Sequence, residues 1–82
     1  MTRGSYLGEF EQIVLLAIVH QRGEGYGVSI LREIEERTGR APSIGAVYTT
    51  LARLEDKGYV RSWLGDTEAA RGGRAKRHFE AL

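Results

Sequence analysis

The sequence predicts a mainly α-helical domain that ends in a small β-hairpin, with three helices followed by two strands. Apolar residues recur at helical spacing in two segments before residue 40. A third helical segment stops at Gly58 and is followed at once by a strand-like run, Tyr59–Leu64. A loop rich in glycine and charge separates that run from a second one, residues 75–80. This α-α-α-β-β order is that of a winged helix-turn-helix.

Length and composition indicate one globular domain, residues 8–82, after a flexible lead over residues 1–7. The chain has 82 residues, 41% apolar and 28% charged. A domain this small buries only about 60% of its unfolded surface, so a partner subunit would add stability. The sequence has no cysteine, and His20 and His78 lack ligand-like spacing, so no metal or cofactor is expected. No apolar run approaches the ~20 residues of a membrane span, which indicates a cytoplasmic protein.

The first helix is expected over residues 8–21. Its apolar residues exceed one stripe, because Leu15 and Leu16 extend an unbroken apolar run over residues 13–19. That run alone also allows a strand, but two glutamates in the first turn favour a helix, since acids complement the helix dipole. A helix that is apolar on more than one side must be covered on more than one side. The candidates for a homodimer contact are therefore Leu15, Leu16 and Val19, with cover from the chain's own wing or tails as the alternative.

The second helix is expected over residues 26–38, with a charged outer face and Gly39 as its C-terminal cap. Tyr26 and Gly27 at its start are interpreted as structural. Gly27 has no Cβ and therefore allows close approach of another helix. The expected buried face consists of Gly27, Ile30, Leu31 and Ile34.

The third helix is expected over residues 44–57. Pro42 disfavours helix in the residue before it, and Ser43 is a natural N-cap whose hydroxyl can accept from a backbone N–H. One side of the helix carries Ile44, Val47, Tyr48, Leu51, Leu54 and Glu55, of which all but Glu55 suit a core. Tyr48 lies at the edge of this stripe, so it is expected either to pack in the core with its hydroxyl reaching a DNA phosphate or to be core alone. The side turned away from that core carries Gly45, Ala46, Thr49, Thr50, Arg53 and Lys57.

The charge distribution is uneven, although the net charge is only +1. Residues 1–42 carry five basic and six acidic side chains, whereas residues 43–82 carry seven and five. The wing, residues 65–77, contains four basic residues and no acid after position 68. Because side chains alternate along a strand, the adjacent Lys76 and Arg77 should face opposite sides. The four basic residues are Arg71, Arg74, Lys76 and Arg77.

Short blocks of residues open each of the three helices, close the third and form the wing. They are Gly8-Glu9-Phe10-Glu11, Gly25-Tyr26-Gly27, Ser43-Ile44-Gly45-Ala46-Val47-Tyr48, Leu51, Leu54-Glu55-Asp56-Lys57-Gly58 and Gly72-Gly73-Arg74-Ala75-Lys76-Arg77. With these blocks the chain resembles the PadR-type family of winged-helix transcriptional repressors over roughly residues 8–79.

The resemblance implies a DNA-binding regulator that works as a dimer and responds to a small hydrophobic or aromatic effector. It also offers an alternative to the structural role of Tyr26, which would approach the DNA backbone or the adjoining helix. The family usually carries a C-terminal helix that pairs with a second subunit, and we expect it to be absent from these 82 residues.

The third helix and the wing hold the candidate contacts to double-stranded DNA. Small residues let a helix enter a major groove about 12 Å wide. Basic wing residues would neutralise phosphates, or an arginine would enter the minor groove. The alternative is that the third helix and the wing present ordinary solvated surface without any DNA contact. Trp63 is interpreted as wing packing or part of an aromatic effector pocket. The candidate DNA contacts are Ser43, Gly45, Ala46, Tyr48, Thr49, Thr50, Arg53, Arg71, Arg74, Lys76 and Arg77.

Catalysis finds no support in the sequence. There is no phosphate-binding glycine loop, no dinucleotide fingerprint after a strand and no nucleophile with a base at a recognisable spacing. The acids are expected on solvated outer helix faces. The prediction is therefore a sequence-specific DNA-binding regulator rather than an enzyme. The competing interpretation is a winged-helix protein-interaction module without DNA affinity, since a fold does not fix a function.

Overall fold

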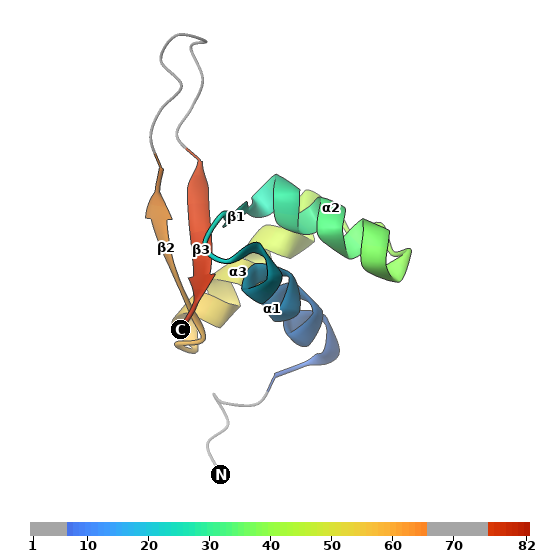
Figure 1. The fold of residues 1–82 in the computed structure, drawn as a ribbon. Helices are drawn as coiled ribbons and strands as arrows, with labels where there is room; N and C mark the ends of the chain where they lie inside the picture. The colour runs from blue at the N-terminus through green and yellow to red at the C-terminus, as the bar shows by residue number, and fades with distance from the viewer. Residues whose placement is uncertain (1–6, 66–75) are drawn as a thin grey trace, which may run out of the picture.

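The structure is a computed structural model that describes residues 7–65 and 76–82. It confirms the predicted winged-helix class, with three helices and a small antiparallel sheet (Figure 1). Of the predicted lead, only Leu7 is described, and it packs against the core. The elements in chain order are α1 (Glu9–Gln21), β1 (Gly25–Tyr26), α2 (Gly27–Thr38), α3 (Ile44–Asp56), β2 (Val60–Leu64) and β3 (Arg77–Ala81).

The sheet has a third strand, β1, that the predicted α-α-α-β-β order lacks. The strand order is β1-β3-β2, and both pairings are antiparallel. Tyr26, expected in the second helix, is extended with φ −139° and ψ 171° and pairs with His78. Two residues are too short to show the alternation that marks a strand. The central strand β3 therefore ties the wing directly to the segment that leads into α2.

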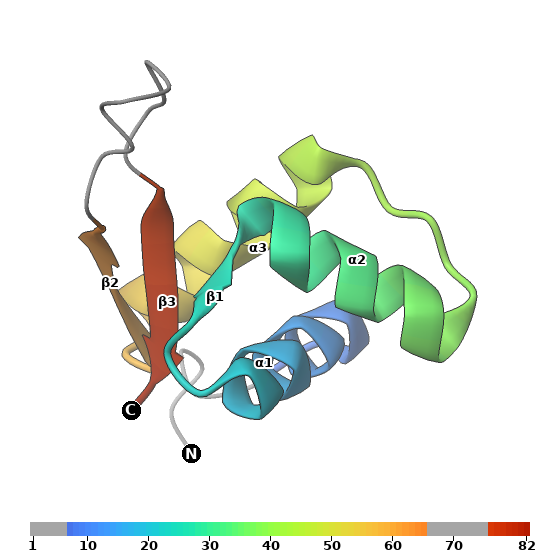
Figure 2. The ribbon, with the colours of Figure 1, turned by 45° about the horizontal axis from the view of Figure 1, so that its top comes forward.

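The core joins all three helices to β2 and β3, and Figure 2 shows the helices gathered on one side of the hairpin. This arrangement buries most of the stripe predicted for α2, of which Leu31 is only partly buried, and the part of the α3 stripe formed by Val47, Leu51 and Leu54. The cluster of buried apolar residues consists of Val14, Ala17, Ile18, Ile30, Ile34, Val47, Leu51, Leu54, Val60 and Phe79.

The predicted end of α2 and the predicted start of α3 are confirmed. Ser43 Oγ accepts a hydrogen bond of 3.0 Å from the Ala46 N–H, which satisfies one of the unpaired donors at the start of α3. Gly39 caps α2 with a left-handed backbone, φ 73°, which glycine adopts without steric cost. These two local signals fix where the α2–α3 connection begins and ends.

Three predicted positions on the third helix are wrong. Thr50 was expected on the exposed side but is 6% exposed, and its hydroxyl donates to the Ala46 carbonyl at 2.9 Å. The reason is spacing, because Thr50 follows Val47 by three residues and so shares its buried face. Conversely, Ile44 and Tyr48 were assigned to the core and are 38% and 48% exposed.

A largely buried ion pair joins α1 to the end of α3, which corrects the expectation that the acids and Lys57 are solvated. Lys57 Nζ lies 3.0 Å from each carboxylate oxygen of Glu11, and the Gly8 N–H donates to Glu11 Oε1 at 2.8 Å. The Gly8 backbone donor and then the Lys57 ammonium lower the pKa of Glu11, more than burial raises it. The ionised carboxylate thus clamps the first turn of α1 onto α3.

Candidate nucleic-acid interface

The exposed face of α3 is small and uncharged in its first half. Gly45, Ala46 and Thr49 are all exposed, and the ring of Tyr48 borders them. Arg53 is exposed one turn further on, while Glu55 and Asp56 put negative charge at the end of the helix. A polyanion can therefore approach the first half of α3 closely, whereas the acidic end would repel it.

Tyr48 joins α3 to the start of α2. A Cβ added at Gly27 would lie 2.8 Å from Cε1 of Tyr48 and would overlap the end of the ring. The predicted role of Gly27 in close helix–helix approach is confirmed by this contact. The close approach is between the first residue of α2 and a half-exposed aromatic ring, which the sequence did not indicate.

Lys76 and Arg77 face opposite sides of the wing, as the alternation predicts. Lys76 Nζ lies 4.2 Å from the centroid of the Tyr26 ring, a cation–π distance. Arg77 Nη1 donates to Ser62 Oγ at 3.1 Å, and the Ser62 hydroxyl in turn donates to the Glu55 carboxylate of α3 at 2.9 Å. Arg77 is therefore on the α3 side of the hairpin, and Lys76 is beside the start of α2. Arg71 and Arg74 lie outside the described residues.

An aromatic row crosses all three strands at the base of the wing. The His78 ring stacks on Trp63 with centroids 6.0 Å apart and meets the edge of Tyr26 at 6.0 Å. His78 Nδ1 also lies 3.2 Å from the Glu24 carbonyl oxygen, before β1. The expected wing packing of Trp63 agrees with these contacts. The contacts of His78 reach residues up to 54 positions away in sequence, so no local pattern could reveal the row.

The three parts of this surface lie on the same side of the molecule. In Figure 2 the start of α3, the start of α2 and the ends of β2 and β3 that lead into the wing all lie in the upper half of the view. The contact of Lys76 with Tyr26 and the closeness of Tyr48 to Gly27 link these parts into one continuous surface. Among the residues predicted for DNA contact, those that the structure describes lie on this surface, apart from the buried Thr50.

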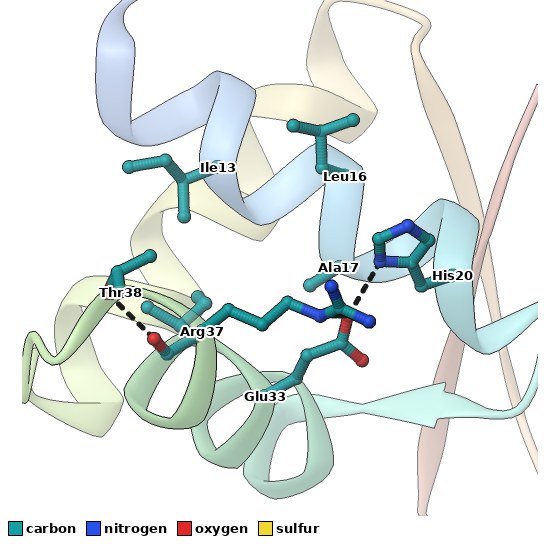
Figure 3. Close-up of a pocket in the computed structure, with 8 residues that line it drawn as sticks. Ile13, Leu16, Ala17, His20, Glu33, Arg37 and Thr38 are labelled. Atoms are coloured by element: carbon teal, nitrogen blue, oxygen red, sulfur yellow. Dashed lines mark hydrogen bonds and ion pairs between the residues drawn. The ribbon is translucent and has the colours of Figure 1, made fainter.

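On a different part of the surface, α1 and α2 enclose an apolar groove of about 200 Å³ (Figure 3). At its polar end, Glu33 accepts hydrogen bonds from Gln21 at 2.8 Å and Arg37 at 3.0 Å, and His20 Nδ1 lies 3.0 Å away. Burial raises the pKa of Glu33. Hydrogen bonds from Gln21 and His20 and the charge of Arg37 lower it by more, so the pKa of Glu33 lies below its ordinary value. The groove is lined by Ile13, Leu16, Ala17, His20, Glu33, Ile34, Arg37 and Thr38.

The candidate dimer residues differ in exposure. Leu16 and Val19 are 60% and 49% exposed, whereas Leu15 is partly buried and packs against the core. The exposed apolar surface of α1 is therefore narrower than the sequence indicated, and it borders the groove at Leu16. Within residues 7–65 and 76–82, no group of three metal-ligating side chains comes together, and no helix has the length and apolar content to cross a membrane.

Three helices with a paired wing and an exposed, small-residue α3 define a winged-helix protein of the kind that regulates transcription. The model of the PadR-like family of transcriptional regulators matches residues 15–81, most of the chain. The chain therefore belongs to the PadR-like family of transcriptional regulators. Among curated individual proteins, the comparison finds no match.

Proposed function

We propose that this chain is a sequence-specific, double-stranded DNA-binding repressor that reads the major groove with the helix over residues 44–57. The observation that carries this proposal is the continuous surface formed by the first half of α3, the start of α2 and the base of the wing. Its α3 part has only small or uncharged side chains, which suits close approach to base edges. The proposed α3 contacts are Ser43, Gly45, Ala46, Tyr48, Thr49 and Arg53.

Each of these contacts has a defined chemistry. Thr49, exposed at the centre of the face, would reach base edges, and Arg53 would reach a phosphate or a guanine. Ser43 at the helix start would meet a phosphate through the dipole and the unpaired amides there. Thr50 is left out, because its hydroxyl is buried and already donates to a carbonyl.

The wing over residues 65–77 would supply the sequence-independent part of the affinity. Arg77, on the α3 side, is suited to a phosphate that borders the groove entered by α3. Lys76 would meet the backbone beside the start of α2. Arg71 and Arg74 complete the proposed basic set. Neutralised phosphates release counterions, so binding should fall steeply with salt.

A homodimer would place two α3 helices in successive major grooves of a palindromic site, about one helical turn apart. The exposed side chains of α1, Leu16 and Val19, with Leu15 behind them, are the proposed contact. Repression would be steric and would be relieved by a small hydrophobic or aromatic effector that changes the spacing of the two helices. A cytoplasmic location follows from this role.

The test is a fluorescence-anisotropy titration of the chain with random duplexes at several salt concentrations, together with light scattering of the free protein. We expect binding that weakens steeply with salt, and a dimer that selects palindromic sites. A dimer that binds no duplex at low salt would contradict the proposal and favour a protein-interaction module. Arg74→Ala with Lys76→Ala should weaken binding to all sequences and flatten the salt slope; unchanged binding would remove the wing from the interface.

A further inference from the structure

Gly27 lies where an ordinary side chain cannot, directly under the ring of Tyr48. A Cβ at this position would overlap the ring carbon and hydroxyl at its tip and would lie 2.8 Å from Cε1. Real Cβ atoms do not approach heavy atoms this closely, so any side chain at position 27 would displace the ring. The ring is 48% exposed, so it can move outward rather than break the core.

Backbone geometry does not explain the glycine. Among described residues, the glycines with positive φ are Gly23, Gly39 and Gly58, and Gly27 is not one of them. Gly27 is the first residue of α2, where alanine would favour the helix more than glycine does. The requirement at position 27 is therefore space for the Tyr48 ring.

The Tyr48 hydroxyl is the polar end of this contact. Within the described residues it makes no hydrogen bond, and it lies against the first residue of α2. The exposed residues Gly45 and Thr49 are three positions before and one position after Tyr48 on α3. The hydroxyl thus stands at the border between the helix that would enter the groove and the helix start that would face the DNA backbone.

We propose that Gly27 is a positioning residue for DNA recognition: the space it leaves fixes the Tyr48 ring so that its hydroxyl donates to a phosphate beside the bases read by α3. The inference rests on the proposed function and adds a specific pair of residues to it. Tyr48 makes the contact, and Gly27 acts only through Tyr48. The two residues are therefore expected to behave as a unit rather than independently.

The test is a double-mutant cycle on the 82-residue chain, with the tightest-binding duplex that the wild type recovers from a random pool. Gly27→Ala and Tyr48→Ala should each weaken binding by about 10- to 100-fold, the range for losing a hydrogen bond to a charged group. In the double variant the methyl group has room, so the loss should equal that of Tyr48→Ala alone. Gly8→Ala is the matched control, because a Cβ there lies at an ordinary 3.7 Å from Glu11 Oε1.

Gly27→Ala that binds like the wild type, or losses that add in the double variant, would overturn the inference while leaving the proposed function intact. A wild type that binds no duplex would instead overturn the proposed function. Folding is checked by circular dichroism. If Gly27→Ala does not fold, the double variant decides, because it should fold as Tyr48→Ala does, and its failure would contradict the space argument. Tyr48→Phe keeps the ring and removes only the hydroxyl. It should reproduce the loss of affinity while leaving the salt slope unchanged, because a neutral hydroxyl neutralises no phosphate charge.

Discussion

At the scale of single residues, the stability of the fold depends on a buried carboxylate, that of Glu11, and on the donors that surround it. Glu11 is 9% exposed and its carboxylate is held by Lys57 and by the Gly8 N–H. Removing the carboxylate from such a cluster takes a charged hydrogen-bond acceptor away from two partly buried donors, which costs more than the pair contributes net. The clamp between α1 and α3 is therefore expected to be sensitive to both mutation and pH.

Glu11→Gln should lower the free energy of unfolding at pH 7 by about 1–3 kcal/mol, because the charge-assisted bonds from Lys57 Nζ to the Glu11 carboxylate are lost. The folded pKa of Glu11 is lowered from 4.5, so the stabilisation is complete above 4.5 and is lost as pH falls toward the lowered value. Urea unfolding at pH 7 and pH 3 should therefore show a difference between variant and wild type that shrinks with acid. Glu9→Gln is the control, because Glu9 is exposed with one 3.5 Å contact to Arg40. A pH-independent difference would contradict the assignment.

Two adjacent threonines on α3 provide a matched pair. Thr49 is exposed on the proposed reading face, and Thr50 is 6% exposed with its hydroxyl bonded to the Ala46 carbonyl. We expect Thr49→Val to change the preference among duplexes by about 1–3 kcal/mol per affected base pair, without altering stability. Thr50→Val should leave that preference unchanged. Selection from a random duplex pool with each variant measures this, and an equal shift for both would refute the assigned faces.

At the scale of elements, β3 connects the parts of the proposed interface. It pairs with β1 on one side and β2 on the other, and its His78 contacts Tyr26 and Trp63 across both pairings. A two-stranded hairpin alone is only marginally stable in water. The third strand and the aromatic row therefore fix the direction of the wing relative to α2.

His78→Ala should loosen the base of the wing and destabilise the fold by roughly 1 kcal/mol, the range for aromatic pairs beyond their buried area. Trp63 is the single tryptophan of the chain, so its fluorescence reports on the stack directly. We expect changed emission in His78→Ala and restoration in His78→Phe, which keeps a ring. His20→Ala on α1 should leave the emission as in the wild type. Emission insensitive to His78 would contradict the stacked arrangement.

The sequence predicted the elements that carry their own periodicity or caps. The Ser43 and Gly39 caps are local patterns that were found in place, and so were Ile30 and Ile34 of the α2 stripe and Val47, Leu51 and Leu54 of the α3 stripe. The strand β1 was not predicted, because two residues are too few to show an alternation of apolar and polar side chains. The tie from Glu11 to Lys57 spans 46 positions, and nothing local to either residue signals it. Thr50 was misplaced because threonine is polar, although its helical spacing from Val47 put it on the buried face.

At the scale of the whole molecule, the proposed DNA surface and the proposed dimer contact lie on different elements. The proposed DNA surface lies over α3, the start of α2 and the wing, whereas the exposed leucine and valine of α1 border the groove beside α2. Contact between two subunits through α1 would therefore leave both DNA surfaces open. This separation makes dimerisation and DNA binding testable by different substitutions.

Leu16→Asp should weaken the dimer without unfolding the subunit, because the Leu16 side chain is already 60% exposed. Burying a leucine contributes about 1.5–3 kcal/mol, and a symmetric contact would use it in both subunits, so the dimer dissociation constant should rise more than tenfold. Sedimentation velocity over a range of concentrations measures this. Leu64→Asp is the matched control, since Leu64 is also 60% exposed but lies on β2. A monomeric wild type, or equal effects of the two substitutions, would remove α1 from the interface.

If the prediction holds, Leu16→Asp should still bind single half-sites with wild-type salt dependence per subunit, because the α3 and wing surface is unchanged.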